Sequence, residues 1–128
     1  MIYLLDTNTF IFASSARARL STTALATLSD PSADLLLSDA SCWEMAIKAA
    51  LGKLDIPDDL GTWIDRESAL MDVDALQISR THVLRVARLP HHHRDPFDRL
   101  LVAQALCEDI PIISIDPVLD AYGVDRIW

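Results

Sequence analysis

The stretch Ile2-Tyr3-Leu4-Leu5-Asp6 decides the fold class of this chain, because a short apolar run ends abruptly on a carboxylate. A run of this length and composition predicts a fully buried strand. The same arrangement returns near the other end of the sequence, where Ile112-Ile113-Ser114-Ile115 precedes Asp116. We therefore expect two buried strands that each end on an aspartate.

Helices and short apolar strands alternate along the rest of the chain, which indicates an α/β protein with a mostly parallel sheet. The predicted strands are 2–6, 35–37, 73–78, 111–115 and, at an edge, 124–128. The predicted helices are 7–14, 20–29, one from the cap Ser41 to Gly52, 59–69, one from the cap Ser79 to the loop at 89–94, and 96–108. The expected architecture is an α/β/α sandwich with a central sheet of four to five strands, formed by residues 1–128 as a single domain.

Caps and apolar positions are predicted within three of these helices. The helix that follows Ser41 has one apolar stripe, made of Trp43, Ile47, Ala50 and Leu51. In the helix capped by Ser79, the expected buried arc is Val83, Val86 and Ala87. Asp95 followed by Pro96 is a standard helix start, with aspartate as the cap and proline in the first helical position.

Composition favours a folded globule, because 51% of the 128 residues are hydrophobic and the charges are scattered. No apolar stretch approaches the roughly 20 residues of a transmembrane helix. The segment Met1 to Asp6 carries neither a basic region nor a cleavage site, so we interpret it as a strand and not as a signal peptide. Cys42 and Cys107 are expected to be small buried hydrophobes, and the protein is expected in the cytoplasm.

The formal net charge of −8 counts against binding nucleic acid by overall charge. Bound metal would offset part of this excess, and local patches matter more than the total. The candidates for a basic groove are Arg17, Arg19, Lys48, Lys53, Arg85, Arg88, Arg94 and Arg99. The simpler interpretation is that these are ordinary solvated charges, so charge alone decides nothing.

Four acids carry the functional argument: Asp6, Glu44, Asp98 and Asp116. Asp6 and Asp116 end apolar strands, while Glu44 and Asp98 fall in the first turns of predicted helices. In an open parallel sheet, strand ends and the helix starts that follow them lie along one edge, where ligands bind. Carboxylates gathered there repel one another unless a cation lies between them, and Mg²⁺ or Mn²⁺ prefers oxygen ligands. The sequence therefore predicts a metal-dependent acidic site made of these four acids.

Three of the acids also have structural explanations. Glu44 would complete an S-x-x-E capping box with Ser41 and would pair with Lys48 one turn later. Asp98 would favour the helix dipole by its charge, and Asp116 precedes a proline and could initiate a turn. These explanations compete with the metal site for each acid taken alone.

Asp6 is harder to explain without a metal, because a carboxylate at the end of a buried strand must be paired, hydrogen-bonded or metal-bound. One shared metal site also explains four acids at one edge of the sheet better than a separate structural role for each acid. Asn8 and Ser114 are expected to orient the acids from behind, and Thr7 to hydrogen-bond Asp6 or a bound phosphate.

Four sequence blocks, taken in order, resemble the PIN-domain ribonucleases. The blocks are Leu5-Asp6-Thr7-Asn8, then Ser41-x-Trp43-Glu44-x-x-x-Lys48 leading to Gly52-Lys53-Leu54, then Asp95-Pro96-Phe97-Asp98-Arg99-Leu100-Leu101-Val102-Ala103-Gln104-Ala105, and Ile113-Ser114-x-Asp116. More narrowly, the chain is similar to the VapC-type toxins of type II toxin–antitoxin systems, and the resemblance covers essentially its whole length. By position, Asp6, Glu44 and Asp98 match the three core acids of the family and Asp116 the fourth.

This resemblance implies a strand–helix sandwich that uses Mg²⁺ or Mn²⁺ to cut RNA internally, with water as the nucleophile and a 5′-phosphate and a 3′-hydroxyl as products. It also implies a homodimer, or a higher toxin–antitoxin assembly, inhibited by a small VapB-like antitoxin whose tail fills the acidic groove. The choice of RNA would come from loop shape and contacts to exposed bases, and not from the acids.

Asp95 competes with Asp98 for the third core acid. The family's acid precedes a run of small residues by an interval that Asp98 satisfies, and Asp95 is better explained as the helix cap. The run His91-His92-His93 lies outside the family's core pattern. It offers ligands for a transition metal or contacts to phosphate, but a solvated loop is the simpler interpretation.

Two other functions compete with a ribonuclease. An aspartyl-phosphate phosphatase also begins with a strand ending in aspartate, but it usually has a second acid two residues later, where this chain has Asn8. A non-catalytic partner-binding module on the same fold would be favoured by the loss of an acid, and all four acids are present. The sequence therefore favours the ribonuclease.

Overall fold

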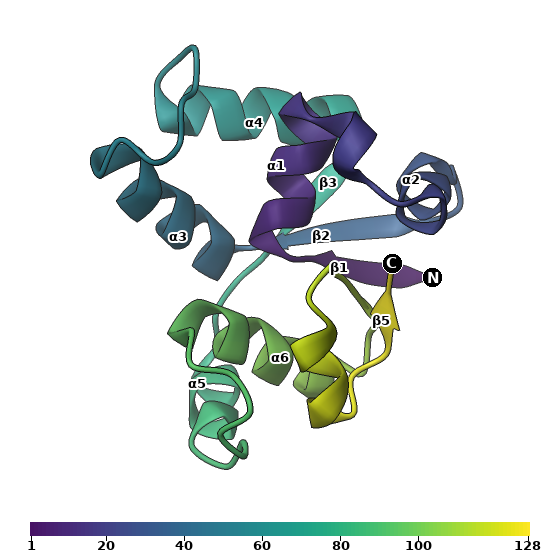
Figure 1. The fold of residues 1–128 in the computed structure, drawn as a ribbon, viewed down its shortest axis with the longest axis vertical. Coiled ribbons are helices and arrows are strands. Elements are labelled where there is room, and N and C mark those ends of the chain that lie inside the picture. Colours follow the sequence, from purple (N-terminus) through teal and green to yellow (C-terminus); the bar gives the residue numbers. More distant parts are fainter.

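The computed structural model describes residues 1–128, in which five parallel strands form one sheet in the order β3-β2-β1-β4-β5 (Figure 1). The strands are β1 (Ile2–Leu5), β2 (Asp34–Ser38), β3 (Val73–Leu76), β4 (Ile112–Ile113) and β5 (Arg126–Ile127). β1 pairs with β2 on one side and with β4 on the other. The chain first adds β2 and β3 on one side of β1 and then adds β4 and β5 on the other side. The topological switch point therefore lies between β1 and β4.

Helices cover both faces of this sheet (Figure 1). They are α1 (Thr7–Ser15), α2 (Thr22–Ser29), α3 (Asp39–Ala50), α4 (Leu60–Met71), α5 (Arg80–Val86) and α6 (Pro96–Glu108), with the short 3-10 helices η1 (Arg17–Arg19) and η2 (Pro117–Tyr122). α1 and α4 lie over one face, and α5, α6 and η2 lie over the other. The predicted sandwich is confirmed, and every strand pair is parallel. None of the helices combines the length and apolar character that crossing a membrane requires.

The apolar residues of β1 and β4 contribute to two separate hydrophobic cores, because successive residues of a strand point to opposite faces of the sheet. Leu5 and Ile113 belong to the core under α1, whereas Leu4 and Ile112 belong to the core under α6. The first core also contains Phe10, Met45 and Trp63, and the second contains Leu101, Val102, Leu119 and Tyr122. This double burial explains why neither strand alternates with polar residues.

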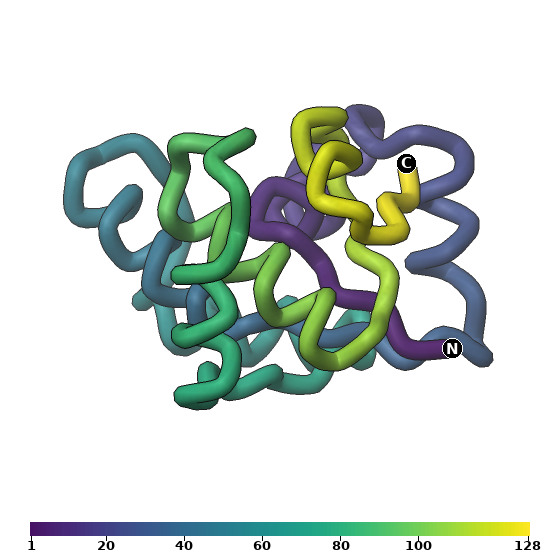
Figure 2. The backbone as a smooth tube through the Cα atoms, turned by 90° about the horizontal axis from the view of Figure 1, so that it is seen from below, coloured from purple at the N-terminus to yellow at the C-terminus, as the bar shows by residue number.

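The edge at which the strands end, here called the carboxyl edge, lies away from the N-terminus. β1 and β5 run in the same direction in the sheet. The N-terminus therefore lies where the strands start, and the C-terminus lies at the carboxyl edge, where they end. The two termini lie close together in the view of Figure 1 and are separated in the turned view of Figure 2. The loops that follow β1 and β4 both leave from the carboxyl edge.

The start of α3 differs from the sequence prediction. The helix begins at Asp39, and the Ser38 hydroxyl accepts the Ala40 N–H at 3.0 Å as its cap. The Ser38 hydroxyl also donates to Oε1 of the buried Gln104 at 2.5 Å, so this one side chain ends β2, caps α3 and binds α6. Ser41 lies inside the helix, and the capping box predicted for Ser41 and Glu44 is therefore wrong.

Two further predictions about side chains change. In α5 the cap Ser79 is confirmed, but Val83, which is 51% exposed, and Ala87 are both exposed, so the predicted buried arc is wrong at these two positions. His82 takes the buried place, with Nδ1 accepting the Ser79 N–H at 3.0 Å and Nε2 lying 2.8 Å from Oε1 of Glu108. Cys42 and Cys107 are free thiols that are only partly buried.

Candidate active site

Asp6 follows β1 directly and caps α1, because its Oδ1 accepts the Thr9 N–H at 2.8 Å. The side chain is almost fully buried, and burial is the main reason why the pKa of its carboxyl group is raised. Hydrogen bonds from Ser114 and Thr9 act against this rise in pKa, while the charge of Glu44 adds to it. Ser114 thus contacts the acid that the sequence predicted it would orient.

Glu44 reaches the site from the middle of α3, and both of its carboxylate oxygens have partners. The Thr7 hydroxyl donates to Oε1 at 2.6 Å and lies 2.9 Å from the hydroxyl of Ser41. Lys48 Nζ lies 3.0 Å from Oε2, as predicted for residues one turn apart. Asn8 is exposed, and its side chain makes no hydrogen bond to the acids. Thr7 therefore orients Glu44 in this structure, where the sequence had associated it with Asp6 or a phosphate.

Asp98 lies in the first turn of α6, where Asp95 is the cap. Asp95 Oδ1 accepts the N–H groups of Phe97 at 2.8 Å and of Asp98 at 3.3 Å, which confirms its predicted structural role. The pKa of Asp98 is raised to about 7, first by burial and then by the charge of Asp95, with smaller contributions from Asp6 and Glu44. His93 acts in the opposite direction. Asp98 therefore interacts electrostatically with Asp6, which follows β1, and with Glu44, which lies on α3.

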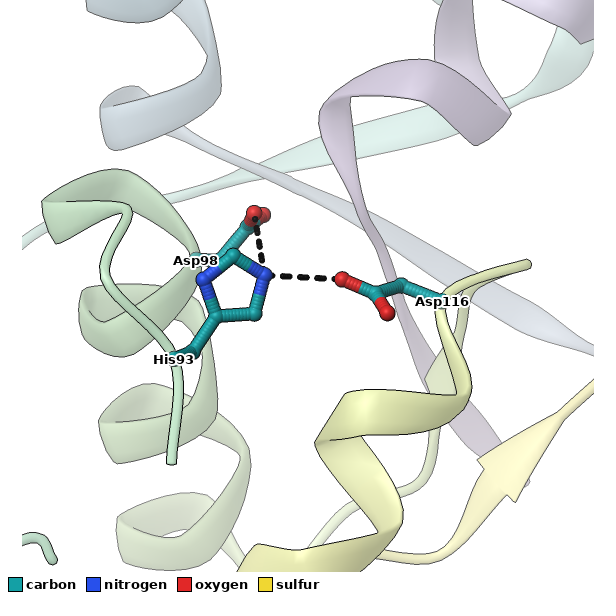
Figure 3. A group of neighbouring side chains, drawn as sticks. All are labelled: His93, Asp98 and Asp116. Atoms are coloured by element: carbon teal, nitrogen blue, oxygen red, sulfur yellow. Dashed lines mark hydrogen bonds and ion pairs between the residues drawn. The ribbon is translucent and has the colours of Figure 1, made fainter. Parts of the chain in front are cut away.

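Asp116 reaches the site from the loop between β4 and η2. Its Oδ1 accepts the Val118 N–H at 3.0 Å, so it caps η2, and its Oδ2 lies 2.8 Å from Nε2 of His93. The same His93 nitrogen lies 3.2 Å from Oδ2 of Asp98. Figure 3 shows the imidazole ring between the two carboxylates, with its nitrogen directed at both.

The position of His93 between two acids was not predicted from the sequence. The interpretation of the histidine run as a solvated loop is correct for the exposed His91 but wrong for His93, which lies between two of the predicted site acids. The one signal available in the sequence was that His93 comes two residues before the cap Asp95 and so must lie beside the N-terminus of α6. Nothing in the sequence places it against Asp116, which lies on a different element.

Arg99 was predicted from the sequence as a candidate for a basic groove, but it is buried in the structure. Its side chain is 8% exposed and donates to the backbone carbonyls of Pro90 at 2.8 Å and Val86 at 3.2 Å, and to the Tyr122 hydroxyl at 3.2 Å. Arg99 therefore supports the loop before α6 and is not available to a ligand. Lys48 is the cation in contact with the acids.

The donor set at the carboxyl edge fits a hard divalent cation. Asp6, Glu44, Asp98 and Asp116 supply only oxygens, which is the ligand chemistry of Mg²⁺ and Mn²⁺. Burial is the main cause of the raised pKa values of Asp6 and Asp98, and neighbouring carboxylates add an excess of negative charge that raises them further. A divalent cation would relieve this excess of charge.

The sheet is parallel, and Asp98 interacts electrostatically with Asp6 and Glu44 and is joined through His93 to Asp116. Open parallel sheets of this kind bind ligands at the carboxyl edge, beside the switch point. The family model of the PIN domain matches residues 3–124, and the chain belongs to the PIN-domain family. PIN domains are generally nucleases. A search of curated proteins found no match to this chain.

Several solved structures share the fold, among them a member of the VapBC family of toxin–antitoxin systems. VapBC2 from Rickettsia felis, bound to a DNA fragment from its promoter, has a TM-score of 0.75 at 13% identity, covering 98% of this chain and 97% of that chain. FitAcB from Neisseria gonorrhoeae has a TM-score of 0.65 at 19% identity, with 98% and 96% covered. VapBC-5 from Mycobacterium tuberculosis has a TM-score of 0.61 at 17% identity, with 98% and 96% covered. At these identities the likeness concerns the fold.

Proposed function

We propose that this protein is a Mg²⁺- or Mn²⁺-dependent endoribonuclease that acts as the toxin of a toxin–antitoxin pair. The observation that carries the proposal is that acids from four separate segments lie at one edge of the sheet. Asp98 interacts electrostatically with Asp6 and Glu44, and His93 joins it to Asp116. Two of these acids, Asp6 and Asp98, have raised pKa values, mainly because they are buried and further because nearby carboxylates repel their charge. Membership of the PIN-domain family supports a nuclease, and the similarity in fold to toxin–antitoxin structures supports the toxin.

Asp6, Glu44 and Asp98 would hold the principal ion, and Asp116 would support it or a second ion. When bound, a divalent ion offsets charge on a phosphodiester and lowers the pKa of an attacking water. Asp6 is suited to this role because it follows β1 directly and its carboxylate is held in place by Thr9 and Ser114. The Thr7 hydroxyl holds Glu44 in a fixed orientation at 2.6 Å.

Lys48 gives the acidic site its one cationic contact. Its ammonium group lies 3.0 Å from Glu44, and the side chain is 33% exposed, so it is accessible to a phosphate of the RNA. An ion bound by Glu44 would take over part of the charge that Lys48 now offsets. Lys48 would then be free to pair with the substrate backbone beside the scissile bond.

An exposed apolar row beside the acids supports a protein partner. Trp43 and Ile47 of α3 and its C-cap Leu51 are spaced four residues apart and are 59%, 38% and 63% exposed, so the apolar stripe predicted from the sequence faces solvent. The Trp43 ring contacts that of Phe97 edge-on, with centroids 4.9 Å apart, which extends the row toward the start of α6. This surface suits an amphipathic antitoxin segment that places an arginine among the carboxylates. We propose a small VapB-like partner and a homodimeric toxin within that complex.

Expression of this chain alone in a bacterial host is expected to arrest growth, because an unrestrained ribonuclease degrades cellular RNA. Co-expression with the proposed VapB-like antitoxin should relieve the arrest. The measurement is the growth rate after induction, with total RNA analysed for new 5′ ends.

The matched control is Asp6→Asn, expressed to the same level, which should not slow growth. Normal growth despite abundant folded wild-type protein would reject the toxin assignment. Arrest by wild type and Asp6→Asn alike would favour a partner-binding module that acts without catalysis.

A further inference from the structure

His93 is placed by four contacts that come from three parts of the chain. Its Nε2 lies 2.8 Å from Asp116 and 3.2 Å from Asp98, and its Nδ1 accepts the backbone N–H of Asp95 at 3.0 Å. Its own backbone N–H donates to the Tyr122 hydroxyl at 2.7 Å. The side chain is 17% exposed, so the ring is held inside the site rather than in solvent.

The contact with Asp95 determines which ring nitrogen carries the proton. A backbone N–H can only donate, so Nδ1 must be the acceptor and has no proton. In the neutral imidazole the proton is then on Nε2. Nε2–H faces the two carboxylates and donates to them, and it has no lone pair to offer a metal. A metal-ligating histidine shows the reverse arrangement, in which the second nitrogen donates its proton outward.

The loop that carries His93 is fixed by buried groups. Besides His93, the Tyr122 hydroxyl accepts the N–H of His92 at 3.1 Å and an N–H of Arg99 at 3.2 Å. Arg99 also binds the carbonyl of Pro90 at 2.8 Å, which anchors the start of the loop. Tyr122 and Arg99 are 9% and 8% exposed. His93 is therefore held on a rigid support.

We propose that His93 is a positioning residue, which cross-links Asp98 to Asp116 through Nε2–H and does not itself bind the ion. This inference rests on the proposed function, and it assigns to the site an ion held by oxygen atoms alone. The two acids come from separate elements, α6 and the loop after β4, and their charges would drive them apart. A shared donor holds one oxygen of each carboxylate near the other. Asp98 Oδ1 makes no hydrogen bond and is left for the ion.

The first test measures Mn²⁺ affinity, by the electron paramagnetic resonance signal of free Mn²⁺, in wild type, His93→Ala and His93→Gln. His93→Ala should weaken binding by roughly 10-fold or more, because the two carboxylates lose their common partner. His93→Gln places an amide N–H near the position of Nε2 and should restore most of the affinity. The matched control His91→Ala removes an exposed histidine from the same loop and should bind like wild type. Affinity in His93→Ala equal to or tighter than that of wild type would overturn the proposal.

The second test needs no substitution of His93, so it does not depend on the folding of His93→Ala. The ring nitrogens of His93 are observed by ¹⁵N NMR in wild-type protein with and without Mg²⁺. The expected result is a protonated Nε2 and an unprotonated Nδ1 in both samples. A proton on Nδ1 together with an unprotonated Nε2 in the presence of Mg²⁺ would show that His93 is a ligand, which contradicts the proposal. Neither test uses RNA, so a wild-type protein that binds Mn²⁺ but cleaves no RNA would reject the proposed function alone.

Discussion

Asp6→Asn is expected to abolish RNA cleavage while the protein stays folded and at least as stable as wild type. Asparagine is as good a helix cap as aspartate, so the hydrogen bond from Thr9 to the side chain is kept. The substitution removes a carboxylate whose pKa is raised by burial and by the charge of Glu44, so it relieves repulsion in the metal-free protein. Several kcal/mol of charge stabilisation would be lost from the reaction, which corresponds to a rate loss of about a thousandfold or more.

The measurements are the single-turnover cleavage rate at saturating Mg²⁺ and the melting temperature in EDTA. The matched control is Asp34→Asn, which changes an exposed aspartate at the start of β2, at the opposite edge of the same sheet. This control should leave both quantities unchanged. Cleavage by Asp6→Asn at the wild-type rate would reject the site.

Asp98→Asn is expected to stabilise the metal-free protein above neutral pH and to have little effect in acid. The pKa of Asp98 is raised from 3.8 to about 7, mainly by burial and then by Asp95. An acid with a higher pKa in the folded state resists ionisation there, so its contribution to stability falls as the pH rises from 3.8 to about 7. Each pKa unit is worth about 1.4 kcal/mol, so the cost at pH 8 is about 4 kcal/mol at most. Asparagine does not ionise and avoids this cost.

Urea unfolding of wild type and Asp98→Asn in EDTA, at roughly pH 4 and pH 8, measures this effect as the free energy of unfolding. The free energy of unfolding of Asp98→Asn should exceed that of wild type at the higher pH, and the two should be nearly equal at the lower pH. Mg²⁺ should then stabilise the wild type at pH 8, where Asp98 is ionised, and stabilise Asp98→Asn far less. Equal stability of the two proteins at the higher pH, with Asp34→Asn as the reference, would show that Asp98 is not under electrostatic strain.

The sequence predicted those elements whose signals are local. β1 and β4 were recognised because each apolar run ends on an aspartate, and α6 was predicted with its observed bounds because Asp95-Pro96 starts it unambiguously. The order in which the strands pair was not predicted. It depends on which strands lie next to β1, and a single sequence contains no direct signal for that.

The errors concern residues whose partners lie far away in the chain. Ser41 was predicted to cap α3, but the cap is Ser38, whose hydroxyl also contacts Gln104, 66 residues later. His93 belonged to a polar run typical of solvated loops, and its contact with Asp116 spans 23 residues. Such contacts exist only once the sheet is assembled, so local patterns cannot reveal them.

The central claim is that the four acids at the carboxyl edge hold a divalent ion that enables RNA cleavage. The most direct measurement incubates purified wild-type protein with single-stranded RNA in EDTA, Mg²⁺ or Mn²⁺, and determines the chemistry of the new ends. The account predicts no cleavage in EDTA, and cleavage with either ion that leaves a 5′-phosphate and a 3′-hydroxyl. Cleavage that continues in EDTA, or products that end in a 2′,3′-cyclic phosphate, would contradict it.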